Sequence, residues 1–540
     1  MHRIHFDQMK LKTPAFVYIN YRQLLYLKKL CARYENSPHR LPQQEERHRK
    51  MKSEMQINLF RGWPNPSLHP RPALSSAATA ILSNPLLSTS ALNYGPDDGD
   101  PSLRAEIARW LSDFYSPPSP VPASRICITG GASQNLACLL QVFSDPLYTK
   151  NVWMVAPTYH LACRIFDDAG FAERLRGVRE DEEGLDVAEL ERGLERSEER
   201  ARAEWKRVGD WNRNQVEENL EPRCAFKPAR PWRKLYKHII YTTPTFSNPS
   251  TKVMSLRRRE ELVRLARKYD ALIISDDVYD HLQWPAFPYV WAKEKYPDKA
   301  VVSRIVDVDR YLDGGPSGEF GNAVSNGSFS KLIGPGCRVG WAEGTAKLVY
   351  GLSQVGSSRS GGSPSQFTST FIRELLASNA LKTHIRTILQ PAYSKRYHTL
   401  TTAVQKHLVP LGVSLPTGPA NETSTDAVGN GSTISACTNG KSAIAGGYFL
   451  WLRLPPGLRA SDLAKKAQEE ENLIIASGSL FKVVREGPGD GNDDGSGEKD
   501  PEDFEGFVRL CFAWEEEEKF EEGAARLARL IRREMHRADA

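Results

Sequence analysis

The sequence predicts an α/β protein with a mostly parallel central sheet between helices and a smaller α+β domain. Three observations predict this class. Short β-rich runs alternate with helical patterns between residues 125 and 275, which is typical of a parallel sheet covered by helices on both faces. The rhythm of strand and helix weakens after Gly344, and a chain of 540 residues is too long for one simple core.

The elements follow in chain order. A helical stretch at Ala73–Leu82 and a Tyr-Gly-Pro turn at 94–96 precede an amphipathic helix at Ser102–Tyr115. Three strand–helix pairs come next, and another strand follows them. The pairs are Arg125–Thr129 with Ser133–Phe143, Val152–Ala156 with His160–Ala169, and His238–Thr242 with Leu256–Lys268, and the strand is Ala271–Ser275. Residues 350–410 are mostly helical in pattern, Tyr448–Leu454 and Phe507–Ala513 are predicted strands, and Glu516–His536 is a predicted terminal helix.

Differences in composition and in secondary-structure pattern divide the chain into four parts. Residues 1–53 form a basic N-terminal extension, with 12 Lys or Arg against 4 Asp or Glu, and residues 54–90 form an N-terminal segment that joins the smaller domain. The larger α/β domain covers 91–349, and the smaller domain covers 350–540. Three segments within them have the composition of insertions or surface loops: 179–237 is charged, with helical residues in its first half, and 416–447 and 486–503 are poor in apolar residues.

Composition excludes several classes of protein. A formal charge of +6 is too small for a nucleic-acid-binding surface, and no apolar run reaches the length of a membrane span. The eight cysteines are scattered without a Cys-x-x-Cys pair, so we expect neither a disulfide framework nor a metal site. Reduced thiols favour a cytoplasmic location, while the basic extension leaves a mitochondrial one open.

A serine-rich segment with one lysine carries the strongest functional signal. Ser328-Phe-Ser-Lys-Leu-Ile-Gly-Pro-Gly-Cys-Arg-Val-Gly-Trp341 resembles the cofactor-lysine motif of the class I/II aminotransferases, which are pyridoxal-phosphate enzymes of fold type I. The resemblance implies that Lys331 binds the aldehyde of pyridoxal 5′-phosphate and moves the substrate proton. It also implies that Ser328, Ser330 and Arg338 hold the phosphate.

Two upstream segments match the parts of this family that contact the cofactor ring. In Ala271-Leu-Ile-Ile-Ser-Asp-Asp-Val-Tyr279 the family's spacing of three selects Asp276 over Asp277 as the partner of the ring nitrogen, with Tyr279 on the ring oxygen. In Pro244-Thr-Phe-Ser-Asn-Pro-Ser-Thr251 the family's pattern makes Asn248 a second ligand of that oxygen and a contact of the substrate. The glycine usual in this turn is replaced here by Thr251 or Ser250, which puts the loop geometry in doubt.

Three further segments follow the family's order. Thr129-Gly-Gly-Ala-Ser closes a strand and opens a helix, so the backbone of Ala132 and Ser133 is expected to face the phosphate. Ala156-Pro-Thr-Tyr159 resembles the segment whose aromatic residue, here Tyr159, stacks on the ring. Tyr94 matches a tyrosine that reaches the phosphate of a neighbouring subunit, and thus implies a homodimer with shared active sites.

Two positions point to the substrate. The segment Phe507-Val-Arg-Leu-Cys-Phe-Ala513 resembles the strand whose arginine, here Arg509, binds the α-carboxylate. Gly62 matches a loop whose backbone contacts the same carboxylate. The resemblance implies transfer of an amino group from an amino acid to a 2-oxo acid by a ping-pong mechanism. The closest subgroup is the one that acts on aromatic, kynurenine or aminoadipate-like substrates.

Two other functions stay open at this point. A lyase, or an enzyme resembling a cyclopropane-carboxylate synthase, would use the same fold and begin from the same covalent chemistry. A non-catalytic regulator that binds the cofactor and DNA would need a winged-helix module ahead of this domain. Residues 1–53 are too short for that module and show no helix-turn-helix pattern. No amino donor and no acceptor can be identified from these motifs alone.

Overall fold

The computed structural model describes residues 55–212, 226–286, 296–316, 318–415, 444–483 and 503–538. The basic extension at 1–53 lies outside the described residues. Most of the two predicted surface loops, at 416–447 and 486–503, lies outside them as well. The proposed domain boundaries stay a prediction. None of the helices in the described part is both long and apolar enough to cross a membrane.

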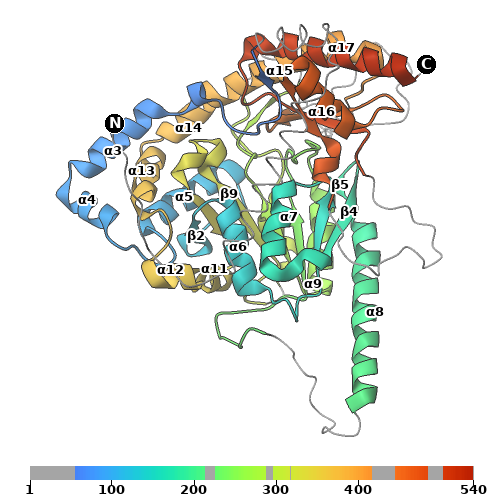
Figure 1. Ribbon diagram of the computed structural model, residues 1–540. Helices are drawn as coiled ribbons and strands as arrows, with labels where there is room; N and C mark the ends of the chain where they lie inside the picture. The colour runs from blue at the N-terminus through green and yellow to red at the C-terminus, as the bar shows by residue number, and fades with distance from the viewer. Residues whose placement is uncertain are drawn as a thin grey trace, which may run out of the picture. The chain divides into compact units, whose positions relative to one another are not determined.

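An eight-stranded sheet forms the centre of the structure (Figure 1). Its spatial order is β2-β10-β9-β7-β6-β3-β4-β5. Strands β9, β7, β6, β3 and β4 pair in parallel, whereas β10 is antiparallel to both β2 and β9, and β5 is antiparallel to β4. The strands are β2 (Ile126–Thr129), β3 (Asn151–Ala156), β4 (Leu175–Asp181), β5 (Gly184–Leu185), β6 (His238–Thr242), β7 (Ala271–Asp276), β9 (Ala323–Ser328) and β10 (Gly340–Glu343).

Helices cover both faces of this sheet, because its strands are apolar on both faces. Leu272 and Ile274 of β7 pack in one core with α6 (Ala132–Phe143), α7 (His160–Phe166) and α11 (Ala346–Ser353). Ala271 and Ile273 pack in another core with α8 (Val187–Asn212), α9 (Leu256–Lys268) and α10 (Ile305–Tyr311). This alternation is expected for a strand that is buried on both sides.

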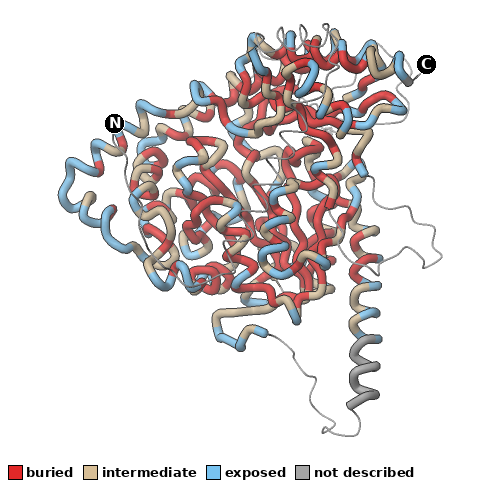
Figure 2. The backbone as a smooth tube through the Cα atoms, viewed as in Figure 1, coloured by how far each residue is buried: buried red, intermediate tan, exposed pale blue. Residues whose placement is uncertain are grey.

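The remaining elements build a second layer of helices and three small sheets. Among the described residues, one of these sheets has three strands in the order β12-β15-β14, and the other two are the pairs β11-β8 and β1-β13. The pair β1-β13 joins the N-terminal segment to the C-terminal part of the chain. Figure 2 shows the buried residues concentrated in the central sheet and under the C-terminal helices. The strands are β1 (Ile57–Asn58), β8 (Gln283–Pro285), β11 (Ile444–Gly446), β12 (Phe449–Arg453), β13 (Leu473–Ile474), β14 (Ala476–Ser477) and β15 (Phe507–Cys511). The helices are α3 (Arg71–Leu82), α4 (Pro85–Leu92), α5 (Pro101–Tyr115), α12 (Gly356–Gly361), α13 (Gln366–Ala377), α14 (Ala380–His384), α15 (Gln390–His407), α16 (Ala460–Glu471) and α17 (Phe520–Ala538).

The predicted fold class is confirmed, and four local expectations need correction. The hydrogen-bonded turn near Tyr94 lies later than predicted, where the amide of Gly99 donates to the carbonyl of Pro96. The charged segment 179–237 begins with the end of β4, so its first residues complete the central sheet, and α8 confirms the helical pattern in its first half. Residues 444–446 form β11 instead of loop. Strands β9 and β10, which flank the lysine motif, were not predicted.

Candidate active site

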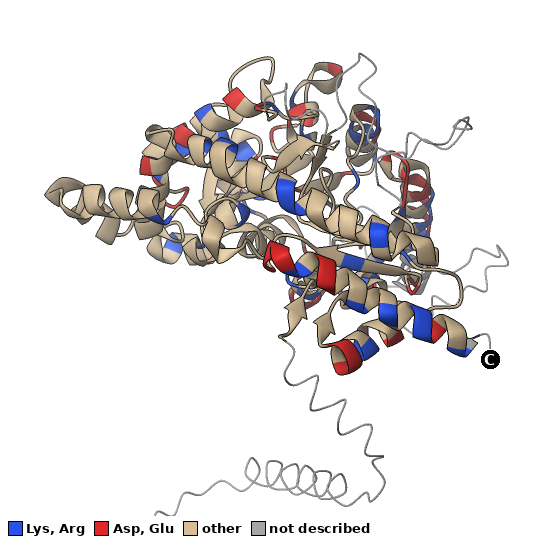
Figure 3. Ribbon diagram, turned by 90° about the horizontal axis from the view of Figure 1, so that it is seen from above, with Lys and Arg blue, Asp and Glu red and all other residues tan. Residues whose placement is uncertain are grey.

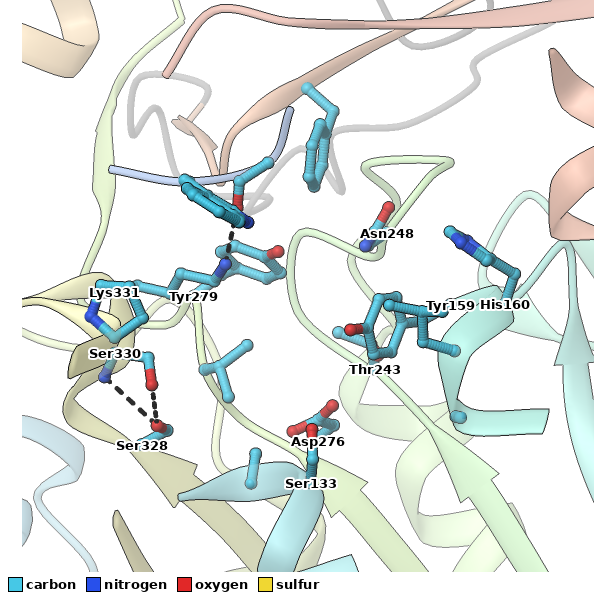
Figure 4. Close-up of a pocket in the computed structure, with 18 of the residues that line it drawn as sticks. Ser133, Tyr159, His160, Thr243, Asn248, Asp276, Tyr279, Ser328, Ser330 and Lys331 are labelled. Carbon is cyan, nitrogen blue, oxygen red and sulfur yellow. Dashed lines mark hydrogen bonds between the residues drawn. The ribbon is translucent and has the colours of Figure 1, made fainter. Parts of the chain in front are cut away.

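A cavity of about 560 Å³ opens where several strands of the central sheet end (Figure 4). Ligand sites in open α/β sheets lie at the carboxyl ends of the strands, and this volume suits a small cofactor with its substrate. Figure 4 shows Lys331 and Tyr279 on one side, Tyr159 and Thr243 on the other, and Asp276 and Ser133 below. The predicted site residues that line the cavity are Gly62, Ala132, Ser133, Tyr159, Asn248, Asp276, Tyr279, Ser328, Ser330, Lys331, Arg338 and Arg509.

Lys331 lies at the end of a short helical turn, Phe329–Lys331, directly after β9. Its amine donates to the carbonyl of Gly62 at 2.8 Å and lies 5.2 Å from the ring centre of Tyr448 and 5.8 Å from that of Tyr279. Burial among these groups lowers the pKa of Lys331 to about 8. The neutral amine, which is the form that acts as nucleophile or base, is therefore accessible near neutral pH.

Asp276 is the last residue of β7 and extends the face of Leu272 and Ile274 into the cavity. One carboxylate oxygen accepts a hydrogen bond of 2.8 Å from the hydroxyl of Tyr241. Burial raises the pKa of Asp276 to about 7. A cationic group placed against this carboxylate would stabilise its ionised form.

Asp277 points to the opposite face, as the alternation of strand side chains requires. Its two oxygens accept hydrogen bonds from the hydroxyls of Ser275 and Ser325, and it does not line the cavity. Only one of the two adjacent acids can thus meet a ligand bound in this cavity.

A compact anion-binding cradle lies beside Lys331. Strand β10 lies between β2 and β9, and its Gly340 aligns with Thr129 on one side and Ser328 on the other. A Cβ at Gly340 would lie 2.5 Å from the carbonyl oxygen of Gly327, so only glycine lets these strand ends approach so closely. The first residues of α6 (Ala132 and Ser133) and the side chains of Ser328 and Ser330 meet there.

Arg338 closes this cradle. One of its terminal nitrogens donates to the carbonyl of Gly130 at 2.8 Å, and the other donates to the carbonyl of Pro335 at 3.1 Å. The hydroxyls of Ser328 and Ser330 lie 2.9 Å apart. A helix N-terminus, two hydroxyls and a guanidinium form a donor set that matches a phosphate group.

Arg509, on β15, is a buried cation with no acidic partner among the described residues. It is 4% exposed, and its guanidinium lies 4.1 Å from the ring centre of Phe449 and 4.8 Å from that of Phe481. Its terminal nitrogens donate to the side-chain oxygen of Asn248 at 2.8 Å and to the carbonyl of Phe60 at 2.7 Å. Burial lowers the pKa of Arg509 to about 10, which marks a charge that lacks an anion.

The loop that carries Asn248 still brings this residue to the cavity, although the glycine usual in the family is replaced. Thr251 has a φ of +64°, a left-handed conformation in which glycine is favoured, and its amide donates to the carbonyl of Ser247 at 2.7 Å. The threonine at this position therefore preserves the turn with some backbone strain. Asn248 is 7% exposed and lines the cavity beside Arg509.

Tyr94 is the one predicted site residue that the structure leaves outside the cavity. Its side chain is 87% exposed, and it is absent from the cavity wall. It lies directly after α4, against Gly361. Within a single chain, Tyr94 therefore makes no contact with the site.

Comparison with known proteins identifies the family of this chain. Residues 66–421 match the family model "Aminotransferase class I and II". An uncharacterized protein of Saccharomyces cerevisiae is 32% identical over 79% of this chain and 89% of its own length. The chain belongs to the class I and II aminotransferases.

Two relatives of known class extend this finding. The "Aromatic-amino-acid aminotransferase 1" of Thermococcus litoralis is 25% identical over 89% of this chain and 88% of its own length. The crystal structure of a kynurenine aminotransferase from Pyrococcus horikoshii has the same fold, with a TM-score of 0.63 and 23% identity over 92% of this chain and 96% of that one. As a member of the class I and II aminotransferases, this enzyme uses pyridoxal phosphate, and its substrates are amino acids and 2-oxo acids.

The residues of this aminotransferase fit that cofactor. The cavity offers a buried amine for the aldehyde in Lys331, a buried carboxylate for the ring nitrogen in Asp276, and the cradle beside Lys331 for the phosphate. The Nε atom of Arg509 is buried without a partner among the described residues, so the adjoining space suits an anionic substrate.

Several residues of the site escaped the sequence motifs. Tyr241 lies on β6, which pairs in parallel with β7, and this places its hydroxyl beside Asp276. The hydroxyl of Tyr448 donates to the carbonyl of Lys331 at 3.1 Å, and the residues His160 and Arg61 also line the cavity. Polar residues near the carboxyl ends of neighbouring strands could have indicated Tyr241. Nothing local in the sequence distinguishes Tyr448.

Proposed function

We propose that this aminotransferase acts on aromatic or aminoadipate-like amino acids and uses a 2-oxo acid as acceptor. The observation that carries the proposal is the buried cation of Arg509 in the same cavity as the low-pKa amine of Lys331. Three further aromatic residues, Phe60, Trp63 and Phe449, line the same cavity and offer an apolar surface to a substrate side chain. The Thermococcus protein is an aromatic-amino-acid aminotransferase and the Pyrococcus protein is a kynurenine aminotransferase, and both similarities support the same substrate class.

The substrate would be held at one end and deprotonated at the other. Arg509 would bind the α-carboxylate through its planar guanidinium, with Asn248 and the backbone of Gly62 beside it. That contact would place the Cα hydrogen toward Lys331. The neutral amine of Lys331 would then take the proton from the substrate Cα and donate it to the cofactor.

Three side chains would hold the cofactor ring. Pyridoxal phosphate, when bound, accepts the electron pair left at Cα. Asp276 would hold a proton on the ring nitrogen, Tyr159 would pack against the ring, and Tyr279 and Asn248 would bind the ring oxygen. The phosphate would be held by Ala132, Ser133, Ser328, Ser330 and Arg338.

A panel of amino donors tests the substrate class, with 2-oxoglutarate as acceptor. The first prediction is that L-phenylalanine, L-tyrosine or L-kynurenine has a kcat/KM about 10- to 100-fold above that of L-alanine, because burial of a large apolar side chain contributes about 1.5–3 kcal/mol. Product 2-oxo acid would be quantified by chromatography. An equal or higher value for L-alanine would contradict the substrate class, and release of ammonia without acceptor would indicate a lyase.

We also propose that the enzyme is a homodimer whose subunits share Tyr94. Helices α3 and α4 project from the body of the structure (Figure 1), and Figure 3 shows this arm almost free of charged residues. Leu86 and Leu92 of α4 are 83% and 68% exposed. Exposed leucines on an uncharged projecting arm are typical of a surface that another subunit covers.

The second prediction tests this arm. Leu86→Asp combined with Leu92→Asp should convert a dimer to a monomer and weaken cofactor retention, because buried carboxylates at an apolar interface are unfavourable. Light scattering gives the mass of the particle. Leu147→Asp, at another exposed leucine, is the matched control and should stay dimeric. A monomeric wild-type protein that is fully active would contradict the proposal.

We propose a cytoplasmic location, with a mitochondrial location as the alternative that the basic N-terminal extension leaves open. Five cysteines of the described part are free thiols, and Cys127, Cys138 and Cys511 among them are buried. Free buried thiols are typical of reducing compartments. Imaging of a C-terminally tagged chain would separate this location from the mitochondrial one.

A further inference from the structure

We infer that Arg61 is a specificity-determining residue that binds the distal carboxylate of a dicarboxylic substrate, an inference that rests on the amino-transfer reaction proposed above. Arg61 lines the same cavity as Lys331 and Arg509. A ping-pong transferase must admit its amino donor and its 2-oxo acid acceptor to one pocket in turn. A pocket with aromatic walls needs a separate cation if either of these substrates carries a second carboxylate.

Two indole rings hold the guanidinium of Arg61 in place. Its central carbon lies 4.5 Å from the ring centre of Trp63 and 4.8 Å from that of Trp514. The two rings meet edge to face at 5.6 Å. Cation–π contacts of this kind orient a planar guanidinium without neutralising its charge.

The charge of Arg61 has no anionic partner among the residues that the structure describes. The acids beside Trp514 are engaged elsewhere. Glu515 accepts from the ammonium of Lys519 at 2.8 Å and from the backbone amide of Asn58 at 2.7 Å. Glu516 accepts from the side chain of Asn65 at 3.3 Å. An oriented cation that lines a substrate cavity without a counterion is suited to a carboxylate.

The loop ties Arg61 to the group that would bind the α-carboxylate. The side-chain oxygen of Asn58 accepts from the amides of Phe60 and Arg61 at 3.1 and 3.0 Å. The carbonyl of Phe60 accepts from Arg509 at 2.7 Å. Two cations are thus connected through consecutive residues of one hydrogen-bonded loop. A substrate anchored at Arg509 would extend its side chain toward the aromatic residues of this loop.

The third prediction concerns Arg61→Met, which keeps the length of the side chain and removes its charge. Single-turnover formation of 2-oxo acid would be measured for L-2-aminoadipate and for L-phenylalanine. The ratio of the two rate constants should fall about 10- to 100-fold in the variant, the size expected for one charge-assisted hydrogen-bonded contact. The same ratio for Arg61→Lys should lie between the values for Arg61→Met and the wild type, because lysine keeps the charge and loses the planar geometry.

A second measurement needs no turnover. Calorimetry would measure the binding of glutarate and of 3-phenylpropionate, which share one carboxylate and differ at the other end. Arg61→Met should weaken the binding of glutarate and leave that of 3-phenylpropionate unchanged. Arg71→Met is the matched control, because its guanidinium donates to the carbonyl of Pro66 outside the cavity wall. Equal losses for both ligands and both donors, or no loss for either, would overturn the inference. If the wild type forms no 2-oxo acid from any donor, the proposed function fails, while glutarate binding still decides the role of Arg61.

Discussion

Replacing Lys331 with alanine should lower turnover by about 10⁴-fold, the upper end of what proton transfer by one positioned side chain contributes. The amine of Lys331 is the only lysine amine on the described wall of the cavity, and burial lowers its pKa to about 8. Steady-state kinetics with an aromatic donor and 2-oxoglutarate measures the loss.

This variant should still fold and bind the cofactor, because the phosphate cradle and Asp276 remain. Lys347→Ala is a suitable control, because that lysine is partly exposed and its ion pair with Glu319 is long, at 3.7 Å. The control should turn over at the wild-type rate. Retention of more than about a tenth of the activity by Lys331→Ala would show that another group moves the proton.

The second large effect separates two adjacent acids. Asp276→Asn should lower turnover by about 10²- to 10³-fold, the size found when one preorganised electrostatic contact is removed. An amide cannot hold a proton on the ring nitrogen as a carboxylate does, although it can still accept from Tyr241. The pKa of Asp276, raised to about 7 by burial, should return to a lower value when the cationic ring binds beside it.

Asp277→Asn serves as the matched variant. Its effect on turnover should be tenfold or less, on the order of 1.4 kcal/mol. Asp277 bonds to Ser275 and Ser325 on the opposite face, and burial together with the neighbouring Asp280 raises its pKa, so neutralising it is tolerated. Kinetics and thermal unfolding would be measured for both variants. Equal losses, or a larger loss for Asp277→Asn, would mean that the assignment of the two acids is reversed.

The choice of Asp276 over Asp277 shows which features of the site local sequence patterns can predict. The two-residue repeat of a strand is a local property, and in the structure it places Asp276 on the cavity wall and Asp277 on the opposite face. Strands with a clear apolar pattern, such as His238–Thr242, were placed to the residue for the same reason. Twelve of the site residues that the family motifs predicted line one cavity, and Tyr94 is the exception. The role of Asp276 at the cofactor stays a prediction.

What the sequence could not predict depends on contacts between distant residues. Strand β10 is short, and only its insertion between β2 and β9 makes it a strand. Tyr448 meets the carbonyl of Lys331 across 117 positions of sequence. Arg61 and Trp514 come together because β1 pairs with β13 and the loop after it packs near the end of β15. None of these contacts leaves a local pattern.

The most direct test of the central claim is to locate the cofactor on the chain. Purified protein would be reduced with borohydride, which fixes pyridoxal phosphate to the amine that holds it, and digested for peptide mass spectrometry. We expect a single modified lysine, Lys331, in the peptide that contains Ser330 and Lys331. Modification of a different lysine, or no fixed cofactor in protein that is active, would contradict it.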